Sequence, residues 1–355
     1  MFKLHSSLTN LIANTCLIAI SLVLSFLFCE VIVRVFFPEP MNPRFVRDTG
    51  FGIRDNQPNI RTHHSSPGEY QVAISTNSDG LRGTNEYNLT TPAGTRRVAI
   101  LGDSFAFGYG CNDDQVVSAV LNKSLNDRRV GGSKWEVLNF GVSGYGQSEE
   151  LMLYRKKTRQ YRPDFVALLY FENDIGNNVV ADTFALDRDG RIEPTGKRYL
   201  PGVAARQWMY AIPPVRWLFV YSQAWNLLRN RLSGLVQQHL LHKVGLKTYN
   251  EGTAYGIALT RSLLLQLQGE VESDGAKFIV MIIPDTNTIT SNFPFTRVEW
   301  QTRGMAVADG RDFIDRNDYY ARDGHWKPLA HRKAAQVLTS MIGEDVALLG
   351  SSLEK

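Results

Sequence analysis

The chain has 355 residues, with 39 Lys and Arg against 35 Asp and Glu, which gives a formal net charge of +4. This small positive excess argues against a dedicated nucleic-acid-binding protein, which concentrates basic residues on one face. Hydrophobic residues make up 43% of the chain, which excludes a largely disordered protein. The three cysteines, two of them inside an apolar run, cannot form a disulfide framework or a four-thiolate zinc site.

Residues 11–33 form an apolar run in which Glu30 is the only charged residue. The run reaches the roughly 20 residues that a helix needs to cross a bilayer. A cleaved signal peptide would have a shorter apolar region, of about 7–15 residues, and then small residues at a cleavage site. The sequence between Leu24 and Pro40 has no such site. We therefore predict that residues 1–40 are an uncleaved membrane anchor.

Two features of the sequence around this anchor favour opposite orientations in the membrane. Lys3 precedes the run and Arg34, Arg44 and Arg47 follow it, a balance that by itself favours a cytoplasmic body. An N-terminal anchor with a very short basic head, in contrast, usually exports the domain attached to its C-terminal end. We predict a single-pass protein whose body is extracytoplasmic, in the periplasm, with Arg34 at the interface paired to Glu30 one turn earlier.

Residues 41–96 are polar and rich in turn-forming residues, and we predict a linker or a small cap there. The alternating piece Tyr70–Ile74 suggests a hairpin within it. His63 and His64 could bind a metal ion, but no acidic residue or cysteine stands at ligand spacing. We therefore expect these two histidines to lie in a solvated loop.

From Arg97 onward, short apolar runs, three of which stop at glycine or proline, alternate with segments of helical spacing. Such runs are typical of parallel strands covered on both faces. The sequence therefore predicts, over residues 97–350, a doubly wound α/β/α sandwich with a mainly parallel five-stranded sheet. The expected strands are 98–101, 135–140, 165–171 and 278–283, with a fifth near Phe313-Ile314, and the expected helices are 116–125, 148–161 and 328–342.

The alternation breaks at about residues 178–252, where three tryptophans are interleaved with arginines. The spacing predicts one or two amphipathic helices over Val215 to Leu241. One interpretation is a lid, or a surface that meets acyl chains, glycans or the bilayer. The other is an ordinary helical insertion whose aromatic residues pack on the main domain. The residues concerned are Trp208, Trp217, Trp225, Arg206, Arg216, Arg229 and Arg231.

Four short blocks carry residues suited to nucleophilic catalysis. Ser104 follows the first predicted strand in Gly-Asp-Ser-Phe, the glycine-rich residues 139–146 end the second strand and follow it, and Asn173 follows the third. Because the carboxyl ends of parallel strands meet at one edge of a sheet, these residues are expected to lie together. His325 lies just before the last helix and has Asp323 two residues away. A serine nucleophile needs such a base, and the base needs an acid that orients it.

In this order the four blocks resemble those of the SGNH/GDSL hydrolase superfamily, over about residues 97–342. The resemblance implies that Ser104 is the nucleophile, that His325 and Asp323 complete a catalytic triad, and that Ser104, Gly144 and Asn173 form the oxyanion hole. It implies no metal and no organic cofactor.

Two blocks depart from the family pattern. The third reads Phe171-Glu172-Asn173-Asp174, where the family usually has Gly-x-Asn-Asp. The last reads Asp-x-His-Trp, where the family usually has Asp-x-x-His, and is similar to alginate O-acetyltransferase-like members. The shorter spacing leaves Asp318 as an alternative orienter and raises acyl transfer as an alternative to hydrolysis.

From this resemblance we expect a membrane-anchored serine esterase that hydrolyses carboxylic esters. Its substrate would be an ester-bearing small molecule, lipid or glycan, with O-acyl groups of envelope glycans or lipids as candidates. The alternatives are an O-acyltransferase that moves acyl groups to or from a polysaccharide, and a non-catalytic glycan-binding or assembly protein on the same scaffold. Phosphoester chemistry would need a metal cluster or basic residues in the blocks near Ser104, and the blocks contain neither.

Overall fold

The computed structural model describes residues 2–243, 254–286 and 288–353. Five strands form a central sheet in the order β6-β5-β7-β10-β11, and all four strand pairs are parallel. This confirms the predicted doubly wound α/β fold, with a sheet that is entirely parallel. The strands are β5 (Thr95–Gly102), β6 (Lys134–Asn139), β7 (Phe165–Tyr170), β10 (Lys277–Ile282) and β11 (Ala306–Asp309).

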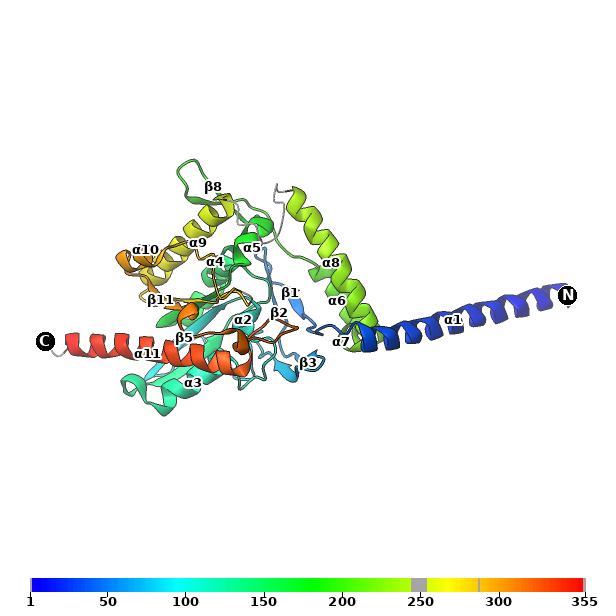
Figure 1. The fold of residues 1–355 in the computed structure, drawn as a ribbon, viewed down its shortest axis with the longest axis horizontal. Coiled ribbons are helices and arrows are strands. Elements are labelled where there is room, and N and C mark those ends of the chain that lie inside the picture. Colours follow the sequence, from blue (N-terminus) through cyan, green and yellow to red (C-terminus); the bar gives the residue numbers. More distant parts are fainter. Residues whose placement is uncertain (1, 244–253, 287, 354–355) are drawn as a thin grey trace.

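Helices cover both faces of this sheet (Figure 1). The helices α3 (Val117–Asp127) and α11 (Pro328–Leu353) pack together on one face, while α4 (Gln147–Lys156), α5 (Asp174–Ala181) and α9 (Ala254–Ser273) cover the other. The central strand β7 is buried at every position. Its alternate side chains enter the two cores, as the two-residue period of a strand requires.

Three two-stranded antiparallel sheets lie outside the central sheet. The strand β4 pairs with β3 and confirms the expected hairpin around Tyr70–Ile74. The expectation of a solvated His63-His64 loop is wrong, because both residues lie on β3 and His64 is buried against the Pro43 carbonyl. The small sheets are β1 (Val46–Asp48) with β2 (Arg54–Asn56), β3 (Arg61–Ser66) with β4 (Tyr70–Ser75), and β8 (Phe184–Leu186) with β9 (Ile192–Pro194).

The fifth strand was predicted in the wrong place. It is β11, at Ala306–Asp309, and not Phe313-Ile314, which follow a short 3-10 helix. Ile314 is buried as a loop residue in the core, which explains its apolar character. The strand β11 is a short, alanine-rich strand at the edge of the sheet, so its apolar signal is weak. The remaining short helices are α2 (Ser104–Phe107), α10 (Arg297–Thr302) and 3-10 segments at Val130–Gly132, Thr158–Tyr161, Gly310–Asp312 and Arg316–Asp318.

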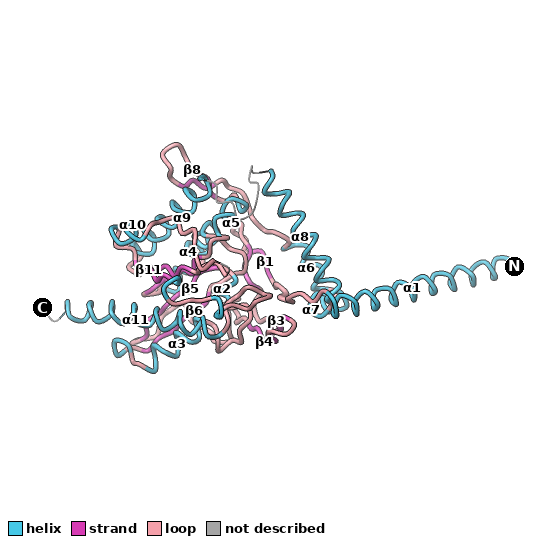
Figure 2. Tube along the Cα trace, in the orientation of Figure 1, coloured by secondary structure: helices cyan, strands magenta, loops and turns pink. Residues whose placement is uncertain are grey.

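The N-terminal helix α1 (Phe2–Phe36) extends away from the rest of the molecule (Figure 1). Its segment Leu11–Phe36 has a mean hydropathy of 2.7 in its most apolar part and is long and apolar enough to cross a membrane. Only 6% of that part is buried inside the protein. The base of α1 contacts α8, so the helical insertion lies where the apolar helix meets the body (Figure 2).

The insertion forms three helices in its described part, α6 (Val203–Ala211), α7 (Pro213–Tyr221) and α8 (Gln223–Lys243). The sequence predicted one or two helices over Val215 to Leu241, and the structure has two there, α7 and α8, while α6 was not predicted. Phe45, Tyr210 and Phe219 form a small apolar cluster that attaches the insertion to the segment before β1. Trp208 and Trp217 remain more than half exposed. Residues 244–252, the end of the predicted insertion, lie outside the described residues.

We predict that Gly141→Ala destabilises the fold, because Gly141 lies against the backbone of α2. A Cβ atom there would be 2.4 Å from the Phe107 nitrogen and 2.8 Å from the Ala106 carbonyl carbon, and backbone atoms cannot easily move away. The expected loss is about 1–3 kcal/mol in the free energy of unfolding, measured by urea denaturation. The control Gly269→Ala, at an exposed position within α9 where a Cβ has open space, should stabilise by roughly 0.5–1 kcal/mol. Equal effects of the two substitutions would contradict the packing argument.

Candidate active site

Three loops at the carboxyl edge of the sheet hold the residues that the sequence singled out. Ser104 begins α2 directly after β5, Gly144 lies in the loop after β6, and Asn173 precedes α5 after β7. The strand order reverses between β5 and β7, which is the topological switch point where open parallel sheets bind ligands. Gly102 makes the turn into Ser104 at φ +140°, and a Cβ there would lie 2.8 Å from Ala106.

A chain of two hydrogen bonds joins Ser104, His325 and Asp323. The Nε2 atom of His325 lies 2.8 Å from Ser104 Oγ, and its Nδ1 atom lies 2.7 Å from Asp323 Oδ2. In this arrangement Nδ1 donates to the carboxylate and Nε2 accepts from the hydroxyl. The serine is therefore placed beside a base, and the base is held by an acid, which is the geometry that nucleophilic catalysis by serine requires.

The acid of this chain is held by residues from the segment before β1 and from the β3–β4 hairpin. The Asn42 amide donates to Asp323 Oδ1 at 2.9 Å, and the Tyr70 hydroxyl donates to Asn42 Oδ1 at 3.1 Å. Glu69 accepts from the main-chain N–H of Asp323 at 3.1 Å. Sequence reasoning missed these three residues, because a lone Asn, Glu or Tyr in a polar segment carries no distinguishing pattern.

The environment of Asp323 favours its charged form. Burial opposes ionisation, but the hydrogen bond and charge of His325, with donors from Tyr70 and Asn42, hold the pKa of Asp323 below its ordinary value. An ionised acid at this position stabilises the positive charge that the imidazole acquires when it takes a proton from the serine.

Aromatic side chains fix the ring of His325. Phe105 and Tyr109 have ring centroids 5.0 and 5.1 Å from the imidazole. Trp326 is fully buried and packs edge-on to Phe105, the residue after Ser104. The tryptophan of the Asp-x-His-Trp block, next to His325 in the chain, therefore packs on the residue that follows Ser104.

Two backbone N–H groups at this edge of the sheet, those of Ser104 and Gly144, are candidates to bind a ligand oxygen. In the part of the chain that the structure describes, neither the Ser104 nor the Gly144 N–H donates to an acceptor. The side chain of Asn173 lies close enough to Asp103, the neighbour of Ser104, to help lower the pKa of that carboxyl against the larger opposite effect of burial. These are the three groups that the family resemblance implies for an oxyanion hole.

A buried ion pair fixes the loop that carries Gly144. Arg54 Nη1 binds Glu149 Oε1 at 2.9 Å, and its Nη2 donates to the carbonyls of Ser143 at 3.1 Å and Gly144 at 2.7 Å. Gly144 has φ +76°, a left-handed conformation that favours glycine. With both carbonyls held by Arg54, the Gly144 N–H keeps a fixed orientation.

Buried carboxyl groups lie beneath this edge of the sheet. Burial raises the pKa of Glu149 to about 7, and burial with the neighbouring acids raises the pKa values of Glu150 and Asp174 well above their ordinary range. Asp174 accepts hydrogen bonds from the Gln147 side chain at 2.6 Å and the Phe171 N–H at 3.2 Å. It thereby fixes the turn that presents Asn173, its neighbour in the chain.

The alternative orienter, Asp318, lies in a different environment. Its Oδ2 atom binds Lys333 Nζ at 2.6 Å and accepts the Asp315 N–H at 2.9 Å, with no contact to His325 in the described residues. Within the described ranges, no group of three or more His, Cys, Asp or Glu side chains could hold a metal ion.

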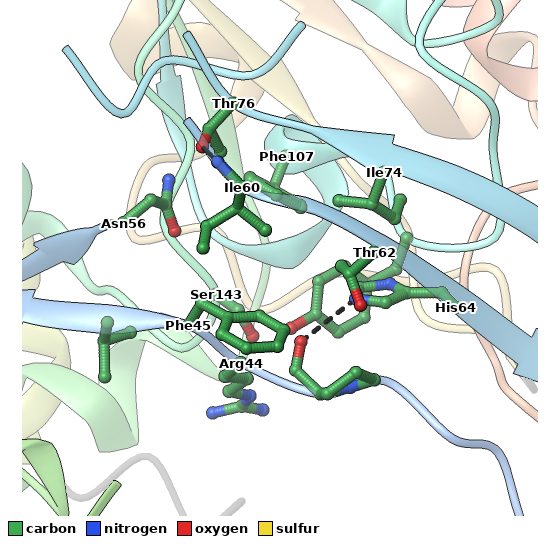
Figure 3. Close-up of a pocket in the computed structure, with 13 residues that line it drawn as sticks. Arg44, Phe45, Asn56, Ile60, Thr62, His64, Ile74, Thr76, Phe107 and Ser143 are labelled. Atoms are coloured by element: carbon green, nitrogen blue, oxygen red, sulfur yellow. Dashed lines mark hydrogen bonds between the residues drawn. The ribbon is translucent and has the colours of Figure 1, made fainter. Parts of the chain in front are cut away.

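A cavity lies next to the hydrogen-bonded chain, between the N-terminal segment and the hairpin (Figure 3). Tyr109 lines it and contacts both His64, at 4.5 Å between ring centroids, and His325. Burial lowers the pKa of His64 to about 3, so this ring is neutral, and its Nε2 donates to the Pro43 carbonyl at 3.2 Å.

Neither a protein-family model nor a curated protein sequence matches the chain. Among solved structures, the chain is similar to TesA (TM-score 0.40, 14% identity, 68% of this chain and 94% of TesA covered). It is also similar to the psychrotrophic esterase EstA from Pseudoalteromonas sp. (0.39, 11%, 71% and 99%) and to a GDSL-like lipase from Bacteroides thetaiotaomicron (0.37, 10%, 73% and 93%). These values are too low to transfer an activity, a substrate or a residue role to this chain.

We predict different effects for the two aspartates that the sequence left as alternatives. Asp323→Asn should lower kcat for ester hydrolysis by up to about four orders of magnitude, because the amide cannot hold the imidazole in the productive tautomer. Asp318→Asn should lower the melting temperature through its contact with Lys333 and leave kcat nearly unchanged. Steady-state kinetics and thermal unfolding of both variants test this. A steep loss of kcat in Asp318→Asn alone would move the orienting role to that residue.

Proposed function

We propose that the protein is a membrane-anchored serine esterase of the SGNH type. The observation that carries this proposal is the unbroken chain from Ser104 through His325 to Asp323, with bonds of 2.8 and 2.7 Å. A binding protein has no need of this geometry, which therefore favours catalysis over the non-catalytic alternative.

In the proposed reaction, Ser104 Oγ attacks the ester carbonyl while His325 Nε2 takes the hydroxyl proton. The tetrahedral oxyanion is stabilised by the N–H groups of Ser104 and Gly144 and by the amide of Asn173, each contributing roughly 3–4 kcal/mol. The intermediate collapses, the alcohol leaves with the proton from His325, and an acyl-serine remains. Water, activated by the same imidazole, then releases the carboxylic acid.

An acceptor hydroxyl in place of water would transfer the acyl group. The Asp-x-His-Trp block favours this second candidate, an O-acyltransferase acting on a polysaccharide. Envelope glycans and lipids with O-acyl groups are the proposed substrates, because the anchor would keep the site close to the membrane. Comparing product formation with and without a polyol acceptor separates transfer from hydrolysis.

We predict that Ser104→Ala lowers kcat/KM for acetyl esters to less than a hundredth of the wild-type value with no change in circular dichroism. The control is Ser143→Ala, a nearby serine whose buried hydroxyl has no hydrogen-bond partner among the described residues. This control should retain most of the activity. Retention of more than about a hundredth of the activity in Ser104→Ala would refute the nucleophile assignment.

Contacts between α1 and the insertion support an anchor that stays attached. Glu30, the charge within the apolar run, accepts hydrogen bonds from the Ser222 hydroxyl at 2.7 Å and from the N–H groups of Gln223 and Ala224 at 2.9 Å. As expected from the sequence, Arg34 pairs with Glu30, at 2.6 Å. Cleavage of α1 as a signal peptide would leave the first turn of α8 without these acceptors.

We predict that the mature protein keeps its N-terminus and that its body lies outside the cytoplasm. N-terminal sequencing should find residues near Met1, and alkaline phosphatase fused after Lys355 should be active. A reporter that works only in the cytoplasm, fused at the same position, is the control and should be inactive. Activity of the cytoplasmic reporter alone would place the catalytic domain on the inner face of the membrane.

A further inference from the structure

The helical insertion and the segment before β1 bring three arginines together. Arg206 lies on α6, Arg229 on α8, and Arg44 just before β1. The Tyr210 hydroxyl, on α6, donates to the Arg44 carbonyl at 3.1 Å and joins two of these segments. Arg206 and Arg229 lie within electrostatic range of each other, and Arg44 lies within electrostatic range of both.

These three guanidinium groups lack a carboxylate partner. In the described part of the chain no ion pair involves any of them; Arg206 donates to a main-chain carbonyl and Arg229 to two asparagine side chains. The exposed Arg44 guanidinium donates to no acceptor there. By contrast, the neighbouring Arg54 has a carboxylate partner, Glu149, at 2.9 Å.

The cluster carries uncompensated positive charge. Burial lowers the pKa of Arg206 to about 10, and the nearby charges of Arg44, Arg54 and Arg229 contribute to this. Burial also lowers the pKa of Arg229, and Arg44 adds to the effect, while Tyr210, Tyr109 and Glu39 oppose it. Half-buried charges without partners are costly, and an anion bound between guanidinium groups removes that cost.

The cluster borders the proposed reaction centre on two sides. Arg44 Nη1 lies 3.4 Å from the position that a Cβ on Gly144 would take, and Figure 3 shows its side chain next to Ser143. Arg229 lies within electrostatic range of Tyr109, whose ring packs on His325 at 5.1 Å. An anion held by these arginines would therefore lie beside the loop that carries Gly144, a residue proposed for the oxyanion hole.

We propose that Arg44, Arg206 and Arg229 form a subsite for an anionic group, a carboxylate or a phosphate, that the ester substrate itself carries close to the scissile bond. This inference rests on the proposed esterase function and names its substrate class. Guanidinium groups suit both anions because their planar N–H pairs match two oxygens of either group. The insertion thereby supplies recognition of the substrate rather than only a covering of the main domain.

The test compares three acetyl esters of matched size with the full chain in detergent. The carboxylate probe is O-acetylglycolate, the phosphonate probe is O-acetyl-hydroxymethylphosphonate, and the neutral control is O-acetylglycolamide; released acetate is measured. The selectivity is kcat/KM for the preferred anionic ester divided by kcat/KM for the neutral amide control. Arg44→Gln and Arg206→Gln should each lower this ratio by about tenfold or more. Arg231→Gln, an exposed arginine two residues from Arg229, should leave the ratio within about twofold. The anionic ester, carboxylate or phosphonate, whose kcat/KM falls more in the arginine variants identifies the group that the substrate carries.

Binding to Ser104→Ala, measured by calorimetry with the two anionic esters, separates this inference from the esterase proposal. One outcome is that Ser104→Ala binds the anionic esters, that adding Arg44→Gln weakens this binding by about tenfold, and that the wild type turns over none of the esters. This outcome would support the subsite and refute the esterase. Turnover with an unchanged ratio in both arginine variants would refute the subsite and leave the esterase standing. Neither turnover nor binding of the anionic esters would overturn both.

Discussion

The hydrogen bond between Ser104 and His325 joins residues 221 positions apart, and the arrangement of the molecule around the site depends on it. Ser104 is fixed by the first strand of the sheet, whereas His325 lies in a loop before the last helix. Neither bond of the hydrogen-bonded chain tolerates a large shift, because hydrogen bonds weaken steeply with distance and angle. Two sets of contacts hold this loop in place relative to the sheet. Phe105 packs on His325 and Trp326, and Asn42 and Glu69 form hydrogen bonds with Asp323.

The N-terminal segment is consequently part of the site. Asn42 reaches Asp323, Arg54 holds the carbonyls of the Gly144 loop, and Arg44 borders that loop on its exposed side. The same segment connects to α1, and the insertion contacts both α1 and the cluster around Phe45. Because of these shared contacts, the N-terminal segment links both α1 and the insertion to the site.

Much of this arrangement could be predicted from local sequence. Continuous apolar runs locate β5, β6 and β7, and the residues after each strand meet at one edge because the strands are parallel. The strand β11 was missed because an alanine-rich edge strand resembles a loop, while the buried loop residue Ile314 resembles a strand. Asn42, Arg54 and the convergence of Arg44 with Arg206 and Arg229 could not be predicted. Each depends on tertiary contacts between segments that share no sequence pattern.

The central claim is that Ser104 is activated as a nucleophile by the chain from Asp323. Treating the full-length protein with a fluorophosphonate and mapping the modified peptide by mass spectrometry tests it most directly, because phosphonylation requires an activated serine but no knowledge of the natural substrate. The account predicts one phosphonyl group on Ser104, with none on Ser143 or on the His325→Ala variant. Modification of another serine, or an unreactive wild-type protein, would contradict it.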